Sequence, residues 1–273
     1  KFGMVGSTDT HTALSSAEDD NFFGKMATAE PSAERLTNAF LSSETSKTGL
    51  AYMDWEVSAS GRAAVWATDN TREAIFDAMD RKETYATTGT RMIVRFFGGF
   101  GFEPGDANNR MPARIGYNKG VPMGGDLRDA PKGKSPTFLV AALKDPIGGN
   151  LDRIQIIKGW VDVNGDVNET IIDVVWSGDR SIDTAGKLAP VGNTVDLTTA
   201  MFTNDIGAAT LMGSWTDPDF DPTEGAFYYA RALEIPTPRW TTYDAVRNNL
   251  PLLDDVPAVI QERAWGSPIW YQP

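Results

Sequence analysis

The pattern of apolar and polar positions changes character near Gly98. Before that glycine, apolar runs alternate with polar stretches in the manner of an α/β protein. The pattern predicts strands at Lys1–Ser7, Ala63–Ala67 and Met92–Phe97, and a helix from Pro31 to about Leu41, because proline suits a first helical turn. The segment Thr8–Gly24 is rich in polar residues and predicts a long loop.

A second helix is expected after the strand at Ala63–Ala67. Asn70 is a suitable N-cap, and Glu73 three residues later completes a capping-box-like pattern. Ile75, Phe76 and Met79 have the spacing of one buried helical face.

After Gly98, short β-rich runs are separated by glycine, proline and asparagine. The clearest signal is the dipeptide Asn164-Gly165, because both residues accept the positive φ angles of a tight hairpin turn. Predicted strands flank that turn and recur on either side of it, at Phe138–Leu143, Ile154–Val163, Asn168–Trp176 and Phe227–Ile235. A short helix is expected at Thr242–Asn248. Several short strands joined by such turns are typical of a β-sandwich.

These elements predict an α/β piece followed by a β-rich, sandwich-like domain. The α/β piece covers residues 1–97, and the β-rich domain covers residues 98–235. Residues 236–273 form a tail that is aromatic and proline-bearing, so we expect it to dock on the rest of the molecule.

Composition narrows the class of protein. The 273 residues carry a net charge of -12, which repels phosphate backbones and argues against a nucleic-acid partner. The acidic residues are spread along the chain, where they serve solubility or favour cations near a site. No run of apolar residues is long enough for a transmembrane segment. Cysteine is absent, which excludes disulfides and thiolate chemistry but leaves both the cytoplasm and the periplasm open as compartments.

The sharpest candidate site is the Asp9-x-His11 pair, which follows a run of small residues at a predicted strand end. A carboxylate and an imidazole two residues apart suit a divalent ion such as zinc, manganese or iron. The alternative is that Asp9 caps a turn and that His11, the one histidine of the chain, is a surface or core side chain.

A second candidate site lies at the loop that contains Thr87, Thr88 and Arg91. Hydroxyl groups and a guanidinium could hold an anionic substrate group. The alternative is a helix-to-strand turn, in which Gly89 supplies an unusual φ and Arg91 pairs with an acidic neighbour.

Longer stretches carry a family resemblance. The segment GSTDTHTALSSAEDDNFFGK resembles the last metal-binding motif of phosphoesterases of the polymerase-and-histidinol-phosphatase (PHP) type, with Thr8 inserted between Ser7 and Asp9. The stretches AVWATDNTREAIFDAMDRKETYATTGTRMIVRFFGG, FYYARALEIPTPRWTTYDA and ERAWGSPIWY are similar to the bacterial domain-of-unknown-function family 3604, which is related to the PHP-type hydrolases.

The resemblance implies that residues 1–97 are the C-terminal remnant of a PHP-like β/α barrel, and that Asp9 and His11 are ligands of a zinc, manganese or iron ion. It also implies hydrolysis of an ester, phosphoester or carbamate bond. The upstream histidines of such a site are not in this chain, so a missing N-terminal half, a companion chain or a second copy in a homo-oligomer is expected to complete it. The alternative is a non-catalytic β-rich module for binding or assembly, with an incomplete metal site.

Overall fold

The structure is a computed structural model that describes residues 1–14, 16–44 and 46–273. Strand residues outnumber helical residues in the described ranges, so the β-rich character expected of the later part of the chain is confirmed. The strands form open sheets, and none of these sheets closes into a barrel within the described ranges.

The larger sheet has eight strands. Its main path runs β10-β9-β12-β13-β4-β3, with β14 paired to both β12 and β7. The strands are β3 (Arg62–Val65), β4 (Thr84–Thr87), β7 (Asp126–Leu127), β9 (Leu151–Val161), β10 (Val167–Trp176), β12 (Ala226–Pro238), β13 (Val259–Gly266) and β14 (Ile269–Tyr271). Strands from before and after Gly98 therefore share one sheet.

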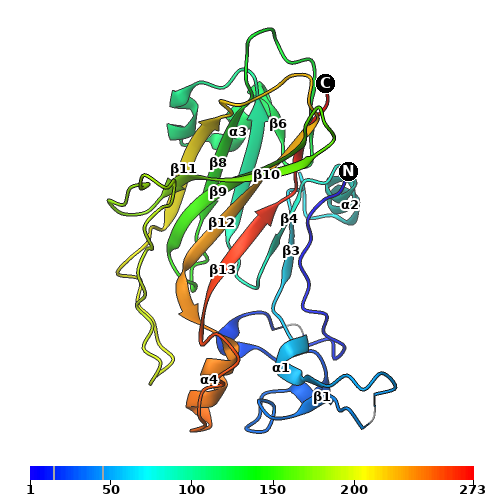
Figure 1. The fold of residues 1–273 in the computed structure, drawn as a ribbon, viewed down its shortest axis with the longest axis vertical. Helices are drawn as coiled ribbons and strands as arrows, with labels where there is room; N and C mark the ends of the chain where they lie inside the picture. The colour runs from blue at the N-terminus through cyan, green and yellow to red at the C-terminus, as the bar shows by residue number, and fades with distance from the viewer. Residues whose placement is uncertain (15, 45) are drawn as a thin grey trace.

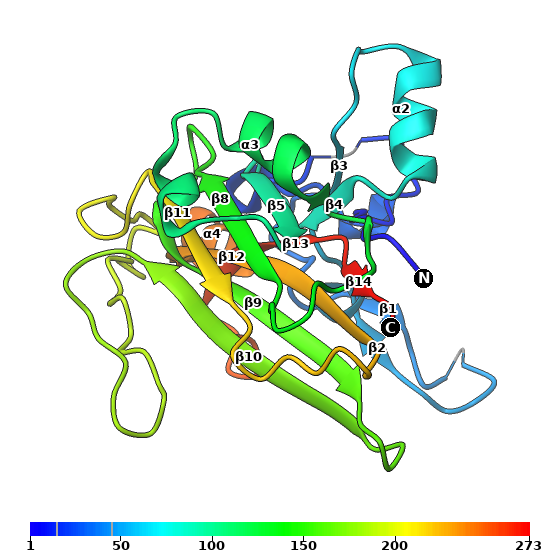
Figure 2. The same ribbon diagram turned by 90° about the horizontal axis from the view of Figure 1, so that it is seen from above.

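The smaller sheet has four strands in the order β11-β8-β5-β6. They are β5 (Ile93–Gly99), β6 (Val121–Pro122), β8 (Thr137–Leu143) and β11 (Thr210–Thr216). Figure 2 shows this sheet layered on the strands β9, β10 and β12 of the larger one. Two short helices, η3 (Pro104–Asn108) and α3 (Pro112–Lys119), lie beside the smaller sheet.

The main core lies between the two sheets, in a sandwich-like arrangement. Phe96 and Phe138 of the smaller sheet are buried together with Ile156 and Tyr228 of the larger one. The ring centroids of Phe138 and Tyr228 lie 4.3 Å apart. Each large apolar side chain buried in this way contributes about 1.5–3 kcal/mol to folding, so this interface holds the two sheets together.

The predicted hairpin is confirmed. β9 and β10 pair antiparallel, and Gly165 in the turn between them has a φ of 85°. The predicted strands at Ala63–Ala67, Met92–Phe97, Phe138–Leu143 and Phe227–Ile235 correspond to β3, β5, β8 and β12, and the helix predicted at Thr242–Asn248 corresponds to α4 (Trp240–Arg247).

The strand predicted at Lys1–Ser7 is wrong. These residues have no strand partner in the described structure and run in extended form beside β3 (Figure 1). They are held by single contacts, such as the Met4 amide donating to Ser267 Oγ at 2.8 Å. The backbone passes so close to its neighbours that a Cβ on Gly6 would lie 2.5 Å from the carbonyl oxygen of Arg62.

The helix predicted from Pro31 to Leu41 is also wrong. That segment forms bends and a turn and then enters β1 (Ala39–Leu41). Its centre is Arg35, which is 2% exposed and forms a short ion pair with Asp244 of α4. The contacts of the Arg35 guanidinium with distant residues stabilise this irregular conformation, and the backbone hydrogen bonds of a helix are not formed.

The elements α1 (Asp54–Val57), α4 and β1 lie together in the lower part of Figure 1. Phe22, Leu36, Trp240 and Ala245 form a small separate core there. The remaining elements of this part are η1 (Asp19–Asn21), η2 (Ala27–Ala29) and β2 (Tyr52–Met53).

Helix α2 (Arg72–Asp80) forms as expected but buries a different face. Thr71 rather than Asn70 caps it, accepting a hydrogen bond from the Ala74 amide. Ala78 is fully buried, whereas Phe76 and Met79 are 66% and 53% exposed, so the predicted buried face is wrong. None of the helices in the described ranges has the length and apolar character needed to cross a membrane.

Candidate functional site

Asp9 and His11 lie together on an exposed turn. The distance from Asp9 Oδ1 to His11 Nε2 is 3.3 Å, and the two side chains are 65% and 51% exposed. Asp9 has a φ of 52°, a left-handed conformation that aspartate tolerates better than most residues. The amide of Asp9 donates to Ser7 Oγ, and the amide of His11 donates to the carbonyl of Lys25, so the turn is fixed on both sides.

Lys25 is the strongest neighbour of Asp9. Its Nζ lies 2.6 Å from Asp9 Oδ2, and this hydrogen bond and charge lower the pKa of the Asp9 carboxyl. Asp9 therefore stays ionised, as a metal ligand must, but one of its two oxygens is occupied by an ammonium group.

The pair fits a metal ion in part. Two ligand atoms at zinc–ligand distances of about 2.0–2.2 Å in a tetrahedral site lie about 3.3–3.6 Å apart, and the observed oxygen-to-nitrogen distance of 3.3 Å is at the lower end of that range. However, no three histidine or acidic side chains within the described ranges are arranged to hold a metal ion. Asp9 and His11 thus supply two donors, and a complete site needs further donors.

The loop of Thr87, Thr88 and Arg91 is engaged in contacts within the protein. Thr87 Oγ1 donates to the carbonyl of Thr90 at 2.6 Å, and Thr88 Oγ1 donates a short hydrogen bond to Glu262 Oε2. Arg91 Nη2 lies 3.0 Å from Glu18 Oε1. Gly89 has a φ of 133°, as the turn interpretation expects. Binding of an anion by this loop stays a prediction, and the carboxylates beside it oppose it.

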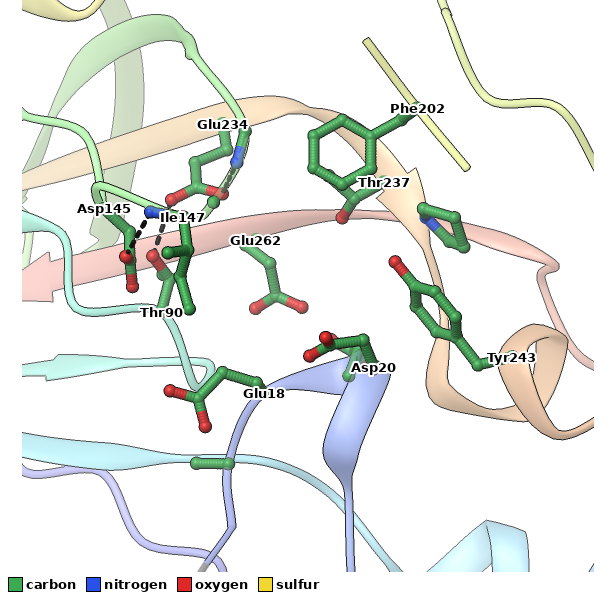
Figure 3. A pocket seen from close by; sticks show the side chains of 15 residues that line it. Glu18, Asp20, Thr90, Asp145, Ile147, Phe202, Glu234, Thr237, Tyr243 and Glu262 are labelled. Atoms are coloured by element: carbon green, nitrogen blue, oxygen red, sulfur yellow. Dashed lines mark hydrogen bonds between the residues drawn. The ribbon is translucent and has the colours of Figure 1, made fainter. Parts of the chain in front are cut away.

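A cavity of about 140 Å³ lies below this loop, where the ends of β12 and β13 meet η1 and α4. We call it the acidic cavity. Figure 3 shows side chains from these elements and from the loop between β8 and β9 pointing into it. Its acidic lining residues are Glu18, Asp19, Asp20, Asp145, Glu234 and Glu262, and no lysine or arginine lines it.

Glu234 forms one wall of the acidic cavity and is 1% exposed. Thr90 Oγ1 donates to its Oε1 at 2.6 Å, and the Gly149 amide donates to its Oε2 at 3.2 Å. Burial raises the pKa of Glu234 from 4.5 to about 7, because it disfavours the charged form more than these hydrogen bonds favour it. Near neutral pH this carboxyl exists in both protonation states.

Asp19 and Glu262 form a carboxyl pair at the centre of the cavity. Burial is the main cause that raises the pKa of both groups, and the hydrogen bond and charge of Asp19 raise the pKa of Glu262 further. Asp19 Oδ1 accepts from the Trp240 amide at 2.8 Å. The opposite side of the pair lines a second cavity of about 160 Å³, which also contains Arg239.

The carboxyl groups of this cavity can accept hydrogen bonds and can exchange protons. Several buried carboxyl groups whose pKa values are raised, gathered around one cavity, make it a candidate functional site. The hydroxyl-bearing ring of Tyr243 completes the wall on the side of α4, and Phe202 lies above it (Figure 3).

Sequence reasoning identified Asp9 and His11 but missed the acidic cavity. Its central residues, Glu234 and Glu262, lie on adjacent strands and become neighbours only through the sheet. One signal was present in the sequence, since Glu234 stands between Leu233 and Ile235 in an apolar strand, where a carboxylate is out of place.

The class defined by these features is a β-rich protein with two facing sheets, an exposed Asp–His pair and an acidic cavity. The chain belongs to the family DUF3604, described as "Protein of unknown function", whose model matches residues 1–273. Comparisons with curated proteins and with solved structures found no match.

Proposed function

We propose that this chain is the C-terminal portion of a metal-dependent hydrolase and that Asp9 and His11 are two of its metal ligands. The observation that carries the proposal is the 3.3 Å distance between Asp9 Oδ1 and His11 Nε2 on an exposed, fixed turn. Both donors are of the type that zinc, manganese or iron accepts.

The remaining ligands are proposed to come from residues outside this chain, either from a preceding part of a PHP-like barrel or from a partner chain or second copy. The ligand count supports this, because a catalytic zinc ion typically has three protein ligands and an open position. A bound divalent ion would supply an activated water for attack on an ester, phosphoester or carbamate bond. Asp9 and His11 would fix the position of that ion, and Lys25 would hold Asp9 in its ionised form.

The test compares residues 1–273 with the product of the full reading frame. Both are purified, analysed for bound transition metal and assayed with phosphoester and carboxylester substrates in the presence of manganese or zinc. We expect the double variant Asp9→Asn, His11→Ala to lower the metal content of the full-frame protein, whereas Asp77→Asn on the exposed face of α2 leaves it unchanged.

Two results would contradict the proposal. Unchanged metal stoichiometry in the double variant would remove Asp9 and His11 as ligands. Turnover by monomeric residues 1–273 at the rate of the full-frame protein would show that the active site lies elsewhere in these residues.

A second candidate function is a non-catalytic module for binding or assembly. The exposed apolar side chains of α2 favour it, since Phe76 and Met79 are 66% and 53% exposed on one helix. Absence of metal from the full-frame protein, together with absence of turnover, would favour this function over the hydrolase.

A further inference from the structure

The outer face of the larger sheet carries aromatic rings and arginines. Along β12, the even-numbered residues from Ala226 to Ala232 are buried in the core between the two sheets. Because side chains alternate along a strand, the odd-numbered residues Phe227, Tyr229 and Arg231 project from the opposite face. In Figure 2 the smaller sheet lies on one side of β9 and β12, and no other sheet of the described chain covers them from the other side.

Phe227 and Tyr229 form an aromatic platform on this face. The Phe227 ring lies over the backbone of Gly159 on β9, since a Cβ on that glycine would lie 2.3 Å from Phe227 Cζ. The planes of the Phe227 and Tyr229 rings differ by 11°, and their centroids lie 6.4 Å apart. The Trp270 ring of β14 lies beside Phe227, with a centroid distance of 5.3 Å. Rings arranged in this way offer a broad apolar surface to a ligand.

The platform continues into a groove at the beginning of β12. Phe227 and Trp270 line this groove together with Trp160 and the polar residues Arg128 and Gln272, and its volume is about 870 Å³. Ligand sites have volumes of about 300–1,000 Å³ and combine an apolar or aromatic lining with a few polar groups. A pyranose ring matches such a lining, because its C–H groups pack on aromatic rings and its hydroxyls reach polar side chains at the rim.

Three arginines lie at the other end of the platform, on neighbouring strands. Arg231 of β12 stands opposite Gln155 of β9 and Trp265 of β13. Arg153 and Arg263 lie two positions away on those strands, so they are diagonal neighbours of Arg231 on the same face. Diagonal neighbours lie about 7–8 Å apart, within reach of long side chains.

Two of these arginines have no carboxylate partner among the described residues. Arg231 Nε and Nη2 donate to Gln155 Oε1 at 2.9 and 2.7 Å. Arg263 Nε donates to the carbonyl of Gln261 at 3.2 Å. Neighbouring guanidinium groups repel each other, and an anion held between them would remove this repulsion. A carboxylate is suited to this position, because it accepts paired hydrogen bonds from guanidinium groups.

The acidic side chains of this face leave that position open. Asp173 of β10 is paired with Arg153, at 3.2 Å. Glu169 of β10 lies opposite Gly159, at the aromatic end of the platform, where it can accept hydrogen bonds from hydroxyl groups. The face therefore has a positive end at its two unpaired arginines and an aromatic end with hydrogen-bond acceptors.

A saccharide suits this face better than a peptide or a nucleic acid. Within a sheet the backbone N–H and C=O groups are already paired, so a peptide that lies across the face finds no backbone partners. A nucleic acid carries one phosphate per nucleotide, which the net charge of -12 repels. An oligosaccharide offers C–H faces to the aromatic rings, and a single uronic acid unit supplies the carboxylate.

We propose that the outer face of β12 and its neighbouring strands binds an oligosaccharide that contains a uronic acid. The uronate carboxylate accepts hydrogen bonds from Arg231 and Arg263, its pyranose ring packs on Tyr229, and the next sugar units extend over Phe227 into the groove. This goes beyond the hydrolase proposal, because Asp9 and His11 belong neither to the groove nor to the larger sheet.

The test is isothermal titration calorimetry on the full-frame protein. The acidic probes are trigalacturonate, trimannuronate and xylotriose that carries one glucuronate unit. The neutral controls are galactotriose, mannotriose and xylotetraose, and hexaglutamate controls for charge without a sugar ring. We expect saturable binding of at least one acidic probe, at least about 10-fold tighter than that of its neutral control, because the charged hydrogen bonds to arginine are lost in the control.

Three variants locate the binding. Arg231→Gln and Arg263→Gln should each weaken binding of the acidic probe by about 10- to 100-fold. Tyr229→Leu keeps an apolar side chain but removes the ring, and should weaken binding by about 3- to 10-fold. Arg72→Gln on the exposed face of α2 makes the same change in net charge as the arginine variants and should leave binding unaltered.

Three outcomes would overturn the proposal. The first is the absence of saturable binding of every acidic probe, which is also the result if another part of the full-frame protein covers this face. The second is equally tight binding of hexaglutamate, which would make the face a site for acidic peptides. The third is unchanged binding in Arg231→Gln, Arg263→Gln and Tyr229→Leu, each shown to be folded by circular dichroism.

The result can be separated from that of the hydrolase proposal. The double variant Asp9→Asn, His11→Ala should bind the acidic probe as tightly as the unmodified protein, whatever its metal content. Loss of metal without loss of saccharide binding, or the reverse, therefore shows which of the two proposals has failed.

Discussion

The N-terminal turn and the acidic cavity hold the same chemical group in opposite surroundings. Asp9 has a side chain that is 65% exposed, and the Lys25 ammonium at 2.6 Å lowers the pKa of its carboxyl. Glu234 is 1% exposed, and burial raises its pKa to about 7 despite two hydrogen bonds to its oxygens.

The contrast shows which effect decides the state of a carboxyl group in each region. On the surface, water already solvates the charge, so a neighbouring cation determines the direction of the shift. In the cavity, desolvation outweighs the hydrogen bonds. The turn therefore presents an ionised carboxylate, whereas the cavity holds carboxyl groups whose burial favours the protonated form.

The largest effect is expected at the buried ion pair of Arg35 and Asp244, which extends the comparison between buried and exposed carboxylates. Arg35 pairs with Asp244 while 2% exposed, and its Nη1 also donates to the carbonyls of Phe22 and Ala29 at 2.7 and 3.1 Å. Arg35→Met would leave Asp244 buried without its cation and two carbonyls without a donor. We expect it to lower the free energy of unfolding by about 3–5 kcal/mol, measured by urea denaturation.

Lys25→Met is the matched control, because the same type of substitution removes a cation whose partner carboxylate, on Asp9, is 65% exposed. Its denaturation midpoint should equal that of the unmodified protein. Equal denaturation midpoints for the two variants would contradict this expectation, because burial would then have no effect on how much each ion pair contributes to stability.

The next effect concerns pH and Glu234. Because the folded protein holds the Glu234 proton more tightly than the unfolded chain, the free energy of unfolding falls as pH rises from 4.5 through about 7. The total change from this group is about 3 kcal/mol. Glu234→Gln retains hydrogen-bonding groups for Thr90 and Gly149 but cannot ionise, so its stability should decline less between pH 5 and pH 8.

Urea denaturation at several pH values between those limits measures this difference. Glu73→Gln, on the exposed face of α2, should reproduce the pH dependence of the unmodified protein. If the Glu234→Gln curve also runs parallel to it, the Glu234 carboxyl titrates as an ordinary surface group and the contrast with Asp9 is lost.

The sequence predicted those elements whose causes are local. The hairpin around Asn164-Gly165 follows from the backbone preferences of two adjacent residues, and α2 forms from a capping pattern within a few positions. The β-rich character of the later part follows in the same way from repeated turns between apolar runs.

The errors occurred where distant residues decide the structure. The segment from Pro31 to Leu41 does not form its predicted helix because Arg35 binds Asp244, which is far away in the sequence. The cavity was missed because Glu234 and Glu262 meet only through the pairing of β12 with β13. Asp9 and His11 could be predicted as a pair because a motif two residues apart needs no tertiary information, and their role as metal ligands stays a prediction.

The smallest effect, and the most direct probe of the turn, is on Asp9 itself. Lys25 is the main cause of its lowered pKa, with His11 as a weaker contributor. Lys25→Met should therefore raise the Asp9 pKa toward its ordinary value of 3.8, as measured by an NMR titration of the carboxyl carbon. Added salt should raise it in the unmodified protein as well, since exposed charges are screened. Lys47→Met, which removes an exposed lysine elsewhere, should leave it unchanged. An unaltered Asp9 pKa in Lys25→Met would show that Lys25 does not bind Asp9 Oδ2 in solution, so Lys25 would not compete with a metal ion for that oxygen.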